Sequence, residues 1–378
     1  MVLVISLGAI GERRNKMRKL KLLLFFLVFS FFFLPIFGVY AQEEILEGKA
    51  IKIIKEEVVT QGGQQSLYQK LEILITKGSL KDKKIEVEVG NISIVGQPKY
   101  KPGDEVLISY SHDFEGDEVF FVTEFVRRKS LAWLLSIFVV LAVVAGRWRG
   151  ASSLLGLGFS FLVIFKFILP NIYAGHDPVF IAIIGSFFII PLTFYLSHGF
   201  NKKTTVAMVG TFIALVITGI LANVFVEAAK LTGYASEEAG FLQVAKQGMM
   251  NIRGLLLAGI IIGTLGVLDD ITISQAAIVQ QLKETSAKIS PRELFSRAMN
   301  VGRDHIASMI NTLVLVYTGA ALPLLLLFID SSHPFSEVVN YEIIAEEIIR
   351  TLIGSIGLIT AVPITTFLAV SFISKRRR

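Results

Sequence analysis

The chain has 378 residues, of which 53% are hydrophobic and only 18% are charged, and its mean hydropathy is +0.64. This composition is typical of an integral membrane protein and excludes an ordinary soluble domain. The chain has no cysteine, which excludes disulfides, thiolate metal sites and cysteine catalysis. The net charge of +6 lies largely beside apolar runs, so we interpret it as a topology signal and expect no nucleic-acid partner.

Residues 1–41 are predicted to form a signal peptide. A basic segment, RRNKMRKLK, precedes the apolar run LLLFFLVFSFFFLPIF, and the small-residue end VYA closes at Ala41. The mature chain would then begin near Gln42, and Met17 is an alternative start. An uncleaved anchor helix is the alternative, because the apolar run is about as long as a membrane span.

Residues 42–128 are predicted to fold as a small extracytoplasmic β-barrel of OB or SH3-like type. Period-two alternation predicts five strands, in GKAIKIIKEEVV, YQKLEILIT, KKIEVEVG, DEVLISYS and DEVFFVTEFV. Turns containing glycine or aspartate separate the strands. We interpret the barrel as a structural cap or a module that contacts an extracytoplasmic protein, because its aromatic residues are scattered and form no stacking platform.

Residues 129–378 are predicted to be a transmembrane domain of about seven α-helical spans, which gives a polytopic α-helical membrane protein. The expected spans lie near 131–146, 152–170, 178–197, 205–226, 252–268, 306–329 and 348–373. Basic and acidic loops alternate along this part of the chain, which predicts a multi-pass membrane protein with its N-terminal domain outside and its C-terminus in the cytoplasm. The lipid bilayer is therefore an expected partner. Seven spans are also compatible with an inverted repeat, and a homo-oligomer is left open.

Two adjacent carboxylates, Asp269 and Asp270, follow the fifth apolar run in the segment GIIIGTLGVLDDITISQ. In one interpretation they form a functional acidic pair at the membrane edge. In the other, Asp270 is the N-cap of a following helix, ITISQAAIVQQLKE. One aspartate is enough for a cap and two adjacent acids repel each other, so the pattern favours a functional role for Asp269.

The sixth predicted span carries polar residues at helical spacing. They are Asp304, His305, Ser308, Asn311, Thr312 and Thr318. Because spans five and six share a cytoplasmic loop, the acidic pair and the start of this stripe are expected at one membrane level, where carboxylates and an imidazole bind a divalent ion or relay protons. The alternatives are a helix N-cap for Asp304 and a hydrogen bond between helices for Asn311.

The fifth span also carries small residues on one face, which predict close helix packing at Gly259, Gly263 and Gly266. Pro323 and Pro363 predict kinks in the last two spans. No HExxH, GxSxG, Walker or dinucleotide motif is present, so neither an enzyme nor a cofactor is predicted. An intramembrane aspartate hydrolase is the weaker alternative, because neither Asp269 nor Asp304 is expected at mid-depth in the bilayer.

The motifs GTLGVLDDITISQAA and VGRDHIASMINTLVLVYTGAALPLLL resemble those of the YibE/F family of multispanning bacterial membrane proteins, and the resemblance extends from about Glu43 to Ser374. The resemblance implies a permease of the bacterial plasma membrane without an assigned substrate. The matching motif positions are Asp269, Asp270, Gln275, Asp304, His305, Asn311, Thr312 and Pro323. We therefore expect a permease for a small solute or ion, driven or gated by protons or cations at the acidic and histidine residues at the cytoplasmic ends of spans five and six. A non-transporting scaffold or sensor that acts through the barrel is the alternative.

Overall fold

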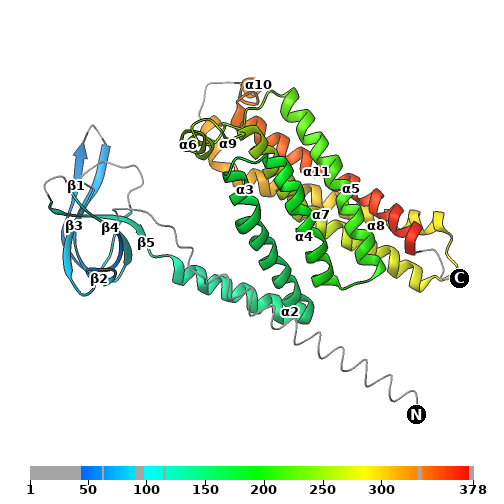
Figure 1. The fold of residues 1–378 in the computed structure, drawn as a ribbon, viewed down its shortest axis with the longest axis horizontal. Coiled ribbons are helices and arrows are strands. Elements are labelled where there is room, and N and C mark those ends of the chain that lie inside the picture. Colours follow the sequence, from blue (N-terminus) through cyan, green and yellow to red (C-terminus); the bar gives the residue numbers. More distant parts are fainter. Residues whose placement is uncertain (1–43, 62–63, 91–97, 114–115, 330–333, 374–378) are drawn as a thin grey trace, which may run out of the picture. The chain divides into compact units, whose positions relative to one another are not determined.

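The structure is a computed structural model that describes residues 44–61, 64–90, 98–113, 116–329 and 334–373. It divides into a β-sheet unit that ends at Leu141 and a helical unit that begins at Ala142 (Figure 1). The predicted signal peptide, residues 1–41, lies outside the described residues. Residue 128, the predicted domain boundary, is where the first described helix begins, whereas the two units divide after Leu141.

The sheet unit contains one five-stranded antiparallel sheet, and all five predicted strands are confirmed. The strands are β1 (Glu44–Gln61), β2 (Gln64–Lys77), β3 (Lys84–Val89), β4 (Glu105–His112) and β5 (Glu118–Phe125), in the order β3-β2-β1-β4-β5. Alternate residues of β2, such as Leu71, Ile73 and Ile75, are fully buried, as period-two alternation requires. The long strand β1 pairs with both β2 and β4, so it forms the centre of the sheet.

The prediction of a closed barrel is wrong, because the outer strands β3 and β5 are not paired with each other in the described part of the sheet. Register shifts near Ala50 and Ile53 curve β1, since an extra residue in one strand bends it. The two outer strands are connected by an ion pair, with 2.6 Å between Lys83 Nζ and Glu118 Oε2. The alternating pattern identifies strands and faces, but it does not determine whether two edges pair.

The first turn of helix α2 (Arg128–Val163) is held to the sheet by ion pairs. The guanidinium of Arg128 pairs with Glu47, and Lys129 Nζ lies 2.5 Å from Glu105 Oε1. Arg128 lowers the pKa of the Glu47 carboxyl below its ordinary value, although burial of the carboxyl acts in the opposite direction. These basic residues are thus neutralised by acids of the sheet.

Replacing Glu47 with glutamine is expected to weaken the sheet at neutral pH, by about 1 kcal/mol at most because solvent screens the pair. A lowered carboxyl pKa adds stability above the unfolded-state pKa, and this gain is lost as pH falls through the folded-state value. The difference between wild type and Glu47→Gln should therefore shrink as pH falls below the ordinary glutamate pKa of about 4.3, and disappear once the pH is below the lowered folded-state value. Amide hydrogen exchange of β1, compared between wild type and Glu47→Gln at equal pH, measures this difference in stability. Glu57→Gln, which removes an exposed partner of Lys55, should show no such difference at any pH.

The helical unit begins within α2, at Ala142, and α2 leaves the helical conformation at Arg147 (φ 50°, ψ −132°). A Cβ atom at Gly150 would lie only 1.9 Å from the carbonyl oxygen of Ala142, so glycine permits the sharp bend there. The chain continues as a π-helical turn (Ile164–Ile168) and α3 (Leu169–Tyr173). The predicted spans 131–146 and 152–170 thus lie on the two sides of one break in a continuous helical stretch.

The other helices follow in chain order and are shown in Figure 1. They are α4 (Pro178–His198), α5 (Lys202–Ala228), α6 (Glu237–Ala245), α7 (Ile252–Thr285), α8 (Pro291–Ala320), α9 (Leu322–Ile329), α10 (Phe335–Val338) and α11 (Glu342–Ile373). By length and apolar composition, five helices of the described chain are able to cross a membrane, the Arg128–Tyr173 stretch counting as one. A sixth is added if α8 and α9, which meet at a bend of 67°, are taken as one span.

The core of the helical unit is formed by α5, α7 and α11, which approach each other closely at glycines. A Cβ atom at Gly357 of α11 would lie 2.4 Å from Thr218 Oγ1 of α5, and one at Gly210 of α5 would lie 2.4 Å from Thr365 Oγ1 of α11. These two contacts show that α5 and α11 are antiparallel. The hydroxyls of Thr211 and Thr272 lie 2.7 Å apart and join α5 to α7 inside this core.

Candidate functional site

The acidic pair lies in the interior of α7, because this helix continues without a break from Ile252 to Thr285. Asp270 is therefore not the N-cap of a separate helix. Asn251 caps α7 instead, since its Oδ1 accepts the backbone N–H of Gly254 at 2.8 Å. No glycine or proline follows the two acids to stop the helix.

The two carboxylates have different surroundings, although they are neighbours in sequence. The Asp269 side chain is partly buried, whereas Asp270 is exposed. Within the described part of the chain, neither carboxylate makes a side-chain hydrogen bond or an ion pair. Placing an aspartate in the apolar part of a membrane helix is costly on insertion scales, by roughly 2.5–3.5 kcal/mol at the centre, so an unpaired one favours a functional explanation.

The polar stripe of α8 lies on the exposed surface of that helix. Its exposed residues are Asp304, Ser308, Asn311, Thr312 and Thr318, and only His305 is partly buried. The opposite face of α8, with Leu294, Ala298, Gly302 and Leu313, contacts the rest of the helical unit. Asp304 lies inside α8, whose N-cap is Ser290, so the N-cap alternative for Asp304 is wrong.

The packing of α7 against α8 separates the acidic pair from Asp304 along the helix axes. Gly302 of α8 lies opposite Gln275 of α7. A Cβ atom added at Gly302 would lie 3.0 Å from Gln275 Nε2. Counting from this contact at 1.5 Å per residue, Asp269 and Asp304 differ in level by about 6 Å. In the described part of the chain, no three His, Cys, Asp or Glu side chains are placed to hold a metal ion. The expected acidic and histidine residues therefore do not assemble as a metal site here.

Gln275, which sequence reasoning had named only through the family motif, is a buried connection between three helices. It is fully buried, and its Nε2 donates to the carbonyl oxygen of Ala298 in α8 at 3.0 Å and to Thr366 Oγ1 in α11 at 2.7 Å. Among the described residues, its Oε1 has no hydrogen-bond partner. Sequence alone gives a weak indication of this role, because a glutamine among apolar residues of a membrane helix usually bonds to a neighbouring helix.

The glycines predicted to pack helices together on α7 face open space. In the described part of the chain, a Cβ atom at Gly259 or Gly266 would meet no atom within 4 Å, and one at Gly263 would meet Tyr317 Oη, at 3.7 Å. Close packing occurs at other glycines, among them Gly302, where a Cβ atom would lie 2.7 Å from Val362 Cγ1. The three α7 glycines continue to Asp270 as one exposed strip of the helix surface.

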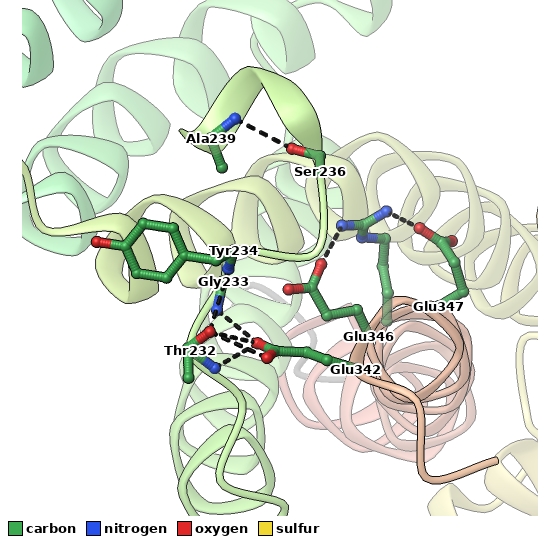
Figure 2. Close-up of polar contacts among 9 residues, drawn as sticks. Thr232, Gly233, Tyr234, Ser236, Ala239, Glu342, Glu346 and Glu347 are labelled. Carbon is green, nitrogen blue, oxygen red and sulfur yellow. Dashed lines mark hydrogen bonds and ion pairs between the residues drawn. The ribbon is translucent and has the colours of Figure 1, made fainter. Parts of the chain in front are cut away.

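A second acidic group lies at the opposite end of the helical unit, around the first turns of α11 (Figure 2). Glu342 accepts the backbone N–H of Gly233 at 2.8 Å, and Arg350 Nη2 lies 3.9 Å from Glu346 Oε2. We expected a loop before a span at 348–373, but the helix begins at Glu342. The i, i+4 spacing of Glu346 and Arg350 is a sequence feature that indicates the longer helix.

Comparison with known proteins gives one match. The model of a family described as YibE/F-like protein matches residues 134–375, which contain every residue of the predicted site. No curated protein and no solved structure matches the chain.

Proposed function

The chain belongs to the YibE/F-like family, and from this premise we propose that it is a permease that moves a small solute or ion across the bacterial plasma membrane, coupled to protons or cations. The family match and the long apolar helices point to a membrane protein. The polar residues within these helices support the transport part of the proposal.

The proposed topology has seven spans. The Arg128–Tyr173 stretch has 46 residues, and a straight helix of that length would measure roughly 70 Å, more than twice the hydrocarbon thickness of about 30 Å. The break at Arg147 lets each arm cross separately. With α8 and α9 as one bent span, the number of spans is seven.

The charges at the helix ends support a cytoplasmic C-terminus and an extracytoplasmic sheet. One set of ends carries Arg147, Arg149, Lys202, Lys203, Lys283, Lys288, Arg292 and Arg297. The opposite set carries Asp177, Glu227, Glu237, Glu238, Glu342, Glu346 and Glu347. Basic residues remain preferentially on the cytoplasmic side of a membrane, so the first set is assigned to the cytoplasm.

The observation that carries the proposal is the partly buried carboxylate of Asp269, which lies inside an apolar helix and has no hydrogen-bond or ion-pair partner among the described residues. Residues of this kind mark ion and proton pathways in transporters. Asp270 and the exposed glycine strip of α7 provide an approach to Asp269 from the surface. The polar face of α8, from Asp304 and His305 to Ser308, Asn311 and Thr312, is the second part of the proposed path.

Reconstitution tests the proposed function. The purified protein is placed in vesicles that contain a pH-sensitive dye, and candidate ions and small solutes are added one at a time under an imposed pH gradient. We expect at least one of them to cause proton or cation flux above that of empty vesicles. Equal flux in protein-containing and empty vesicles across ions, sugars, amino acids and carboxylates would remove the support for a permease.

A second candidate function is a scaffold or sensor that acts through the sheet. Exposed apolar side chains on β1 and β5, namely Ile45, Ile54, Val58 and Phe121, favour it because such groups mark protein contacts. Deletion of residues 43–128 separates the two candidates in cells. Loss of the cellular phenotype with flux retained in vesicles would favour the sensor, whereas an unchanged phenotype would exclude it.

A further inference from the structure

The exposed face of α8 carries polar and small residues that recur with a period of seven. Its members are all exposed in the described structure, and we name them together the α8 seam. They are Asp304, Ala307, Asn311, Val314 and Thr318. A repeat of seven residues keeps one side of a helix facing a second helix along its length, as in a coiled coil. The spacing therefore points to a second helix packed along this face.

The α8 seam lies opposite the face by which α8 packs in its own chain. On the packed face, Leu313 is buried, and a Cβ atom at Gly302 would lie 2.7 Å from Val362 Cγ1 of α11. Asn311 follows Gly302 by about two and a half turns of the helix, which places it on the other side. Among the described helices of the helical unit, none covers the seam.

Asn311 lies at a depth where an unpaired amide is costly. Because α7 and α8 are joined by a short loop and meet at Gly302 and Gln275, α8 runs antiparallel to α7. Counting from this contact, Asn311 lies roughly 20 Å from the level of Arg253 and roughly 25 Å from that of Lys283, near the two ends of α7. Within the described chain its amide makes no hydrogen bond. An amide in the middle of the hydrocarbon layer needs a partner.

A second copy of the chain is the partner that fits this seam. An asparagine amide has both donors and an acceptor, so it is able to pair with an identical amide. When two α8 helices are related by a twofold axis along the membrane normal, each seam residue faces its own counterpart. Ala307 and Thr318 are small enough for the two helices to approach closely. A single asparagine in such a repeat also specifies the register and the number of helices, whereas an apolar helix would leave the amide unpaired.

We propose that the chain forms a homodimer through the α8 seam, in which the Asn311 amides of the two copies are hydrogen-bonded to each other. Asp304 lies about 10 Å closer to the cytoplasmic side than Asn311, so water near the membrane surface screens the repulsion between the two carboxylates. Arg303, which is exposed beside it, adds a positive charge.

The role of this dimer in transport rests on the proposed permease function, but the dimer itself does not. In a single copy, the polar face of α8 is open and faces lipid. In the dimer, the second copy closes it, so the part of the proposed path on α8 lies between two identical helices. Each copy then contributes its own Asn311 and Asp304 to the same path.

Disulfide cross-linking of the full-length protein in vesicles tests the dimer. The chain has no cysteine, so Ala307→Cys or Thr318→Cys places one thiol on the seam. Val316→Cys is the matched control, because Val316 is 61% exposed on the same helix but lies outside the seam. Under mild oxidation, we expect either seam variant to give a several-fold higher yield of a species of twice the mass than the control. Equal yields in all three variants would overturn the proposal.

Replacing the amide tests the contact at the centre of the seam. In the Thr318→Cys background, Asn311→Leu should lower the cross-linking yield several-fold, because leucine offers no hydrogen bond to the second copy. Thr312→Val is the matched control, since the Thr312 hydroxyl donates to the carbonyl oxygen of Ser308 in its own helix at 3.1 Å. It should leave the yield unchanged. An undiminished yield in Asn311→Leu would overturn the proposed pairing.

Energy transfer keeps the test valid if the seam variants fail to insert, because it leaves α8 unaltered. Glu238→Cys, an exposed position on α6, is labelled with an equal mixture of donor and acceptor dyes. Transfer should persist as the lipid-to-protein ratio is raised, and a decline to the level of freely diffusing monomers would overturn the proposal. Neither method requires transport. Absence of flux would therefore refute the permease and leave the dimer standing, whereas monomers with flux would refute the dimer alone.

Discussion

Asp269→Asn is expected to reduce coupled flux in reconstituted vesicles to the level of empty vesicles, with normal insertion and abundance. Asparagine has nearly the same size as aspartate, but it neither binds and releases a proton nor carries a charge. The Asp269 carboxylate makes no hydrogen bond or ion pair with the described residues, so the change removes no stabilising contact. A buried aspartate is costly in a membrane helix, and its neutralisation should if anything stabilise the fold.

Asp270→Asn is the matched control, because it makes the same change one residue away, on the exposed side of the helix. We expect a partial loss of flux, since Asp270 lies on the approach to Asp269. Asp304→Asn tests the second part of the path, and a loss of flux there would extend the site to α8. Wild-type flux in Asp269→Asn would remove this residue from the mechanism, whatever the other two variants show.

The strands were predictable because burial has a period of two. In β2, the apolar residues Leu71, Ile73 and Ile75 recur at every second position, and only one strand register buries all three. Closure of the sheet was not predictable from this pattern. Closure requires backbone hydrogen bonds between β3 and β5. In the described sheet these two strands are not paired, and an ion pair joins Lys83, the residue before β3, to Glu118 of β5.

The apolar runs predicted the centres of the helices but not their ends. An apolar run stops where the chain meets polar surroundings, whereas a helix stops only where its backbone hydrogen bonds stop. After Leu268, α7 contains no glycine or proline, so it continues through both aspartates to Thr285. Similarly, α11 begins at Glu342, before the apolar run, because glutamate and isoleucine are both compatible with a helix.

The candidate site was only partly predictable because a stripe of residues does not reveal which neighbour it faces. The polar stripe of α8 was expected to meet the acidic pair, but Leu294, Ala298 and Leu313 form the face that packs. The glycines of α7 were expected to pack, but Gly259 and Gly266 meet nothing nearby. Periodicity defines the faces of a helix, and the tertiary arrangement decides which face is covered.

Gly357→Ala is expected to destabilise the helical unit by about 1–3 kcal/mol, the usual cost of overpacking a close contact. The added methyl group would lie 2.4 Å from Thr218 Oγ1 and 3.4 Å from Thr264 Cγ2, so α5 or α11 must move. Gly259→Ala is the matched control, because no atom lies within 4 Å of its Cβ position. It should be neutral or stabilising by up to about 1 kcal/mol, since alanine favours a helix. Thermal unfolding of both variants in detergent measures the difference, and equal effects would contradict the packing described here.

A second substitution shows whether the cost of Gly357→Ala arises at the contact with α5. Thr218→Ala removes the hydroxyl that the new methyl group would meet, and within the described chain this hydroxyl donates to the carbonyl oxygen of Ala214 in its own helix, at 2.8 Å. The double variant should therefore be more stable than the sum of the two single changes predicts, because residues in direct contact are not additive. Additive losses would mean that Gly357 is needed for another reason, such as its contact with Thr264 of α7. Since α5, α7 and α11 all meet at this glycine, its replacement tests how closely these three helices pack against one another.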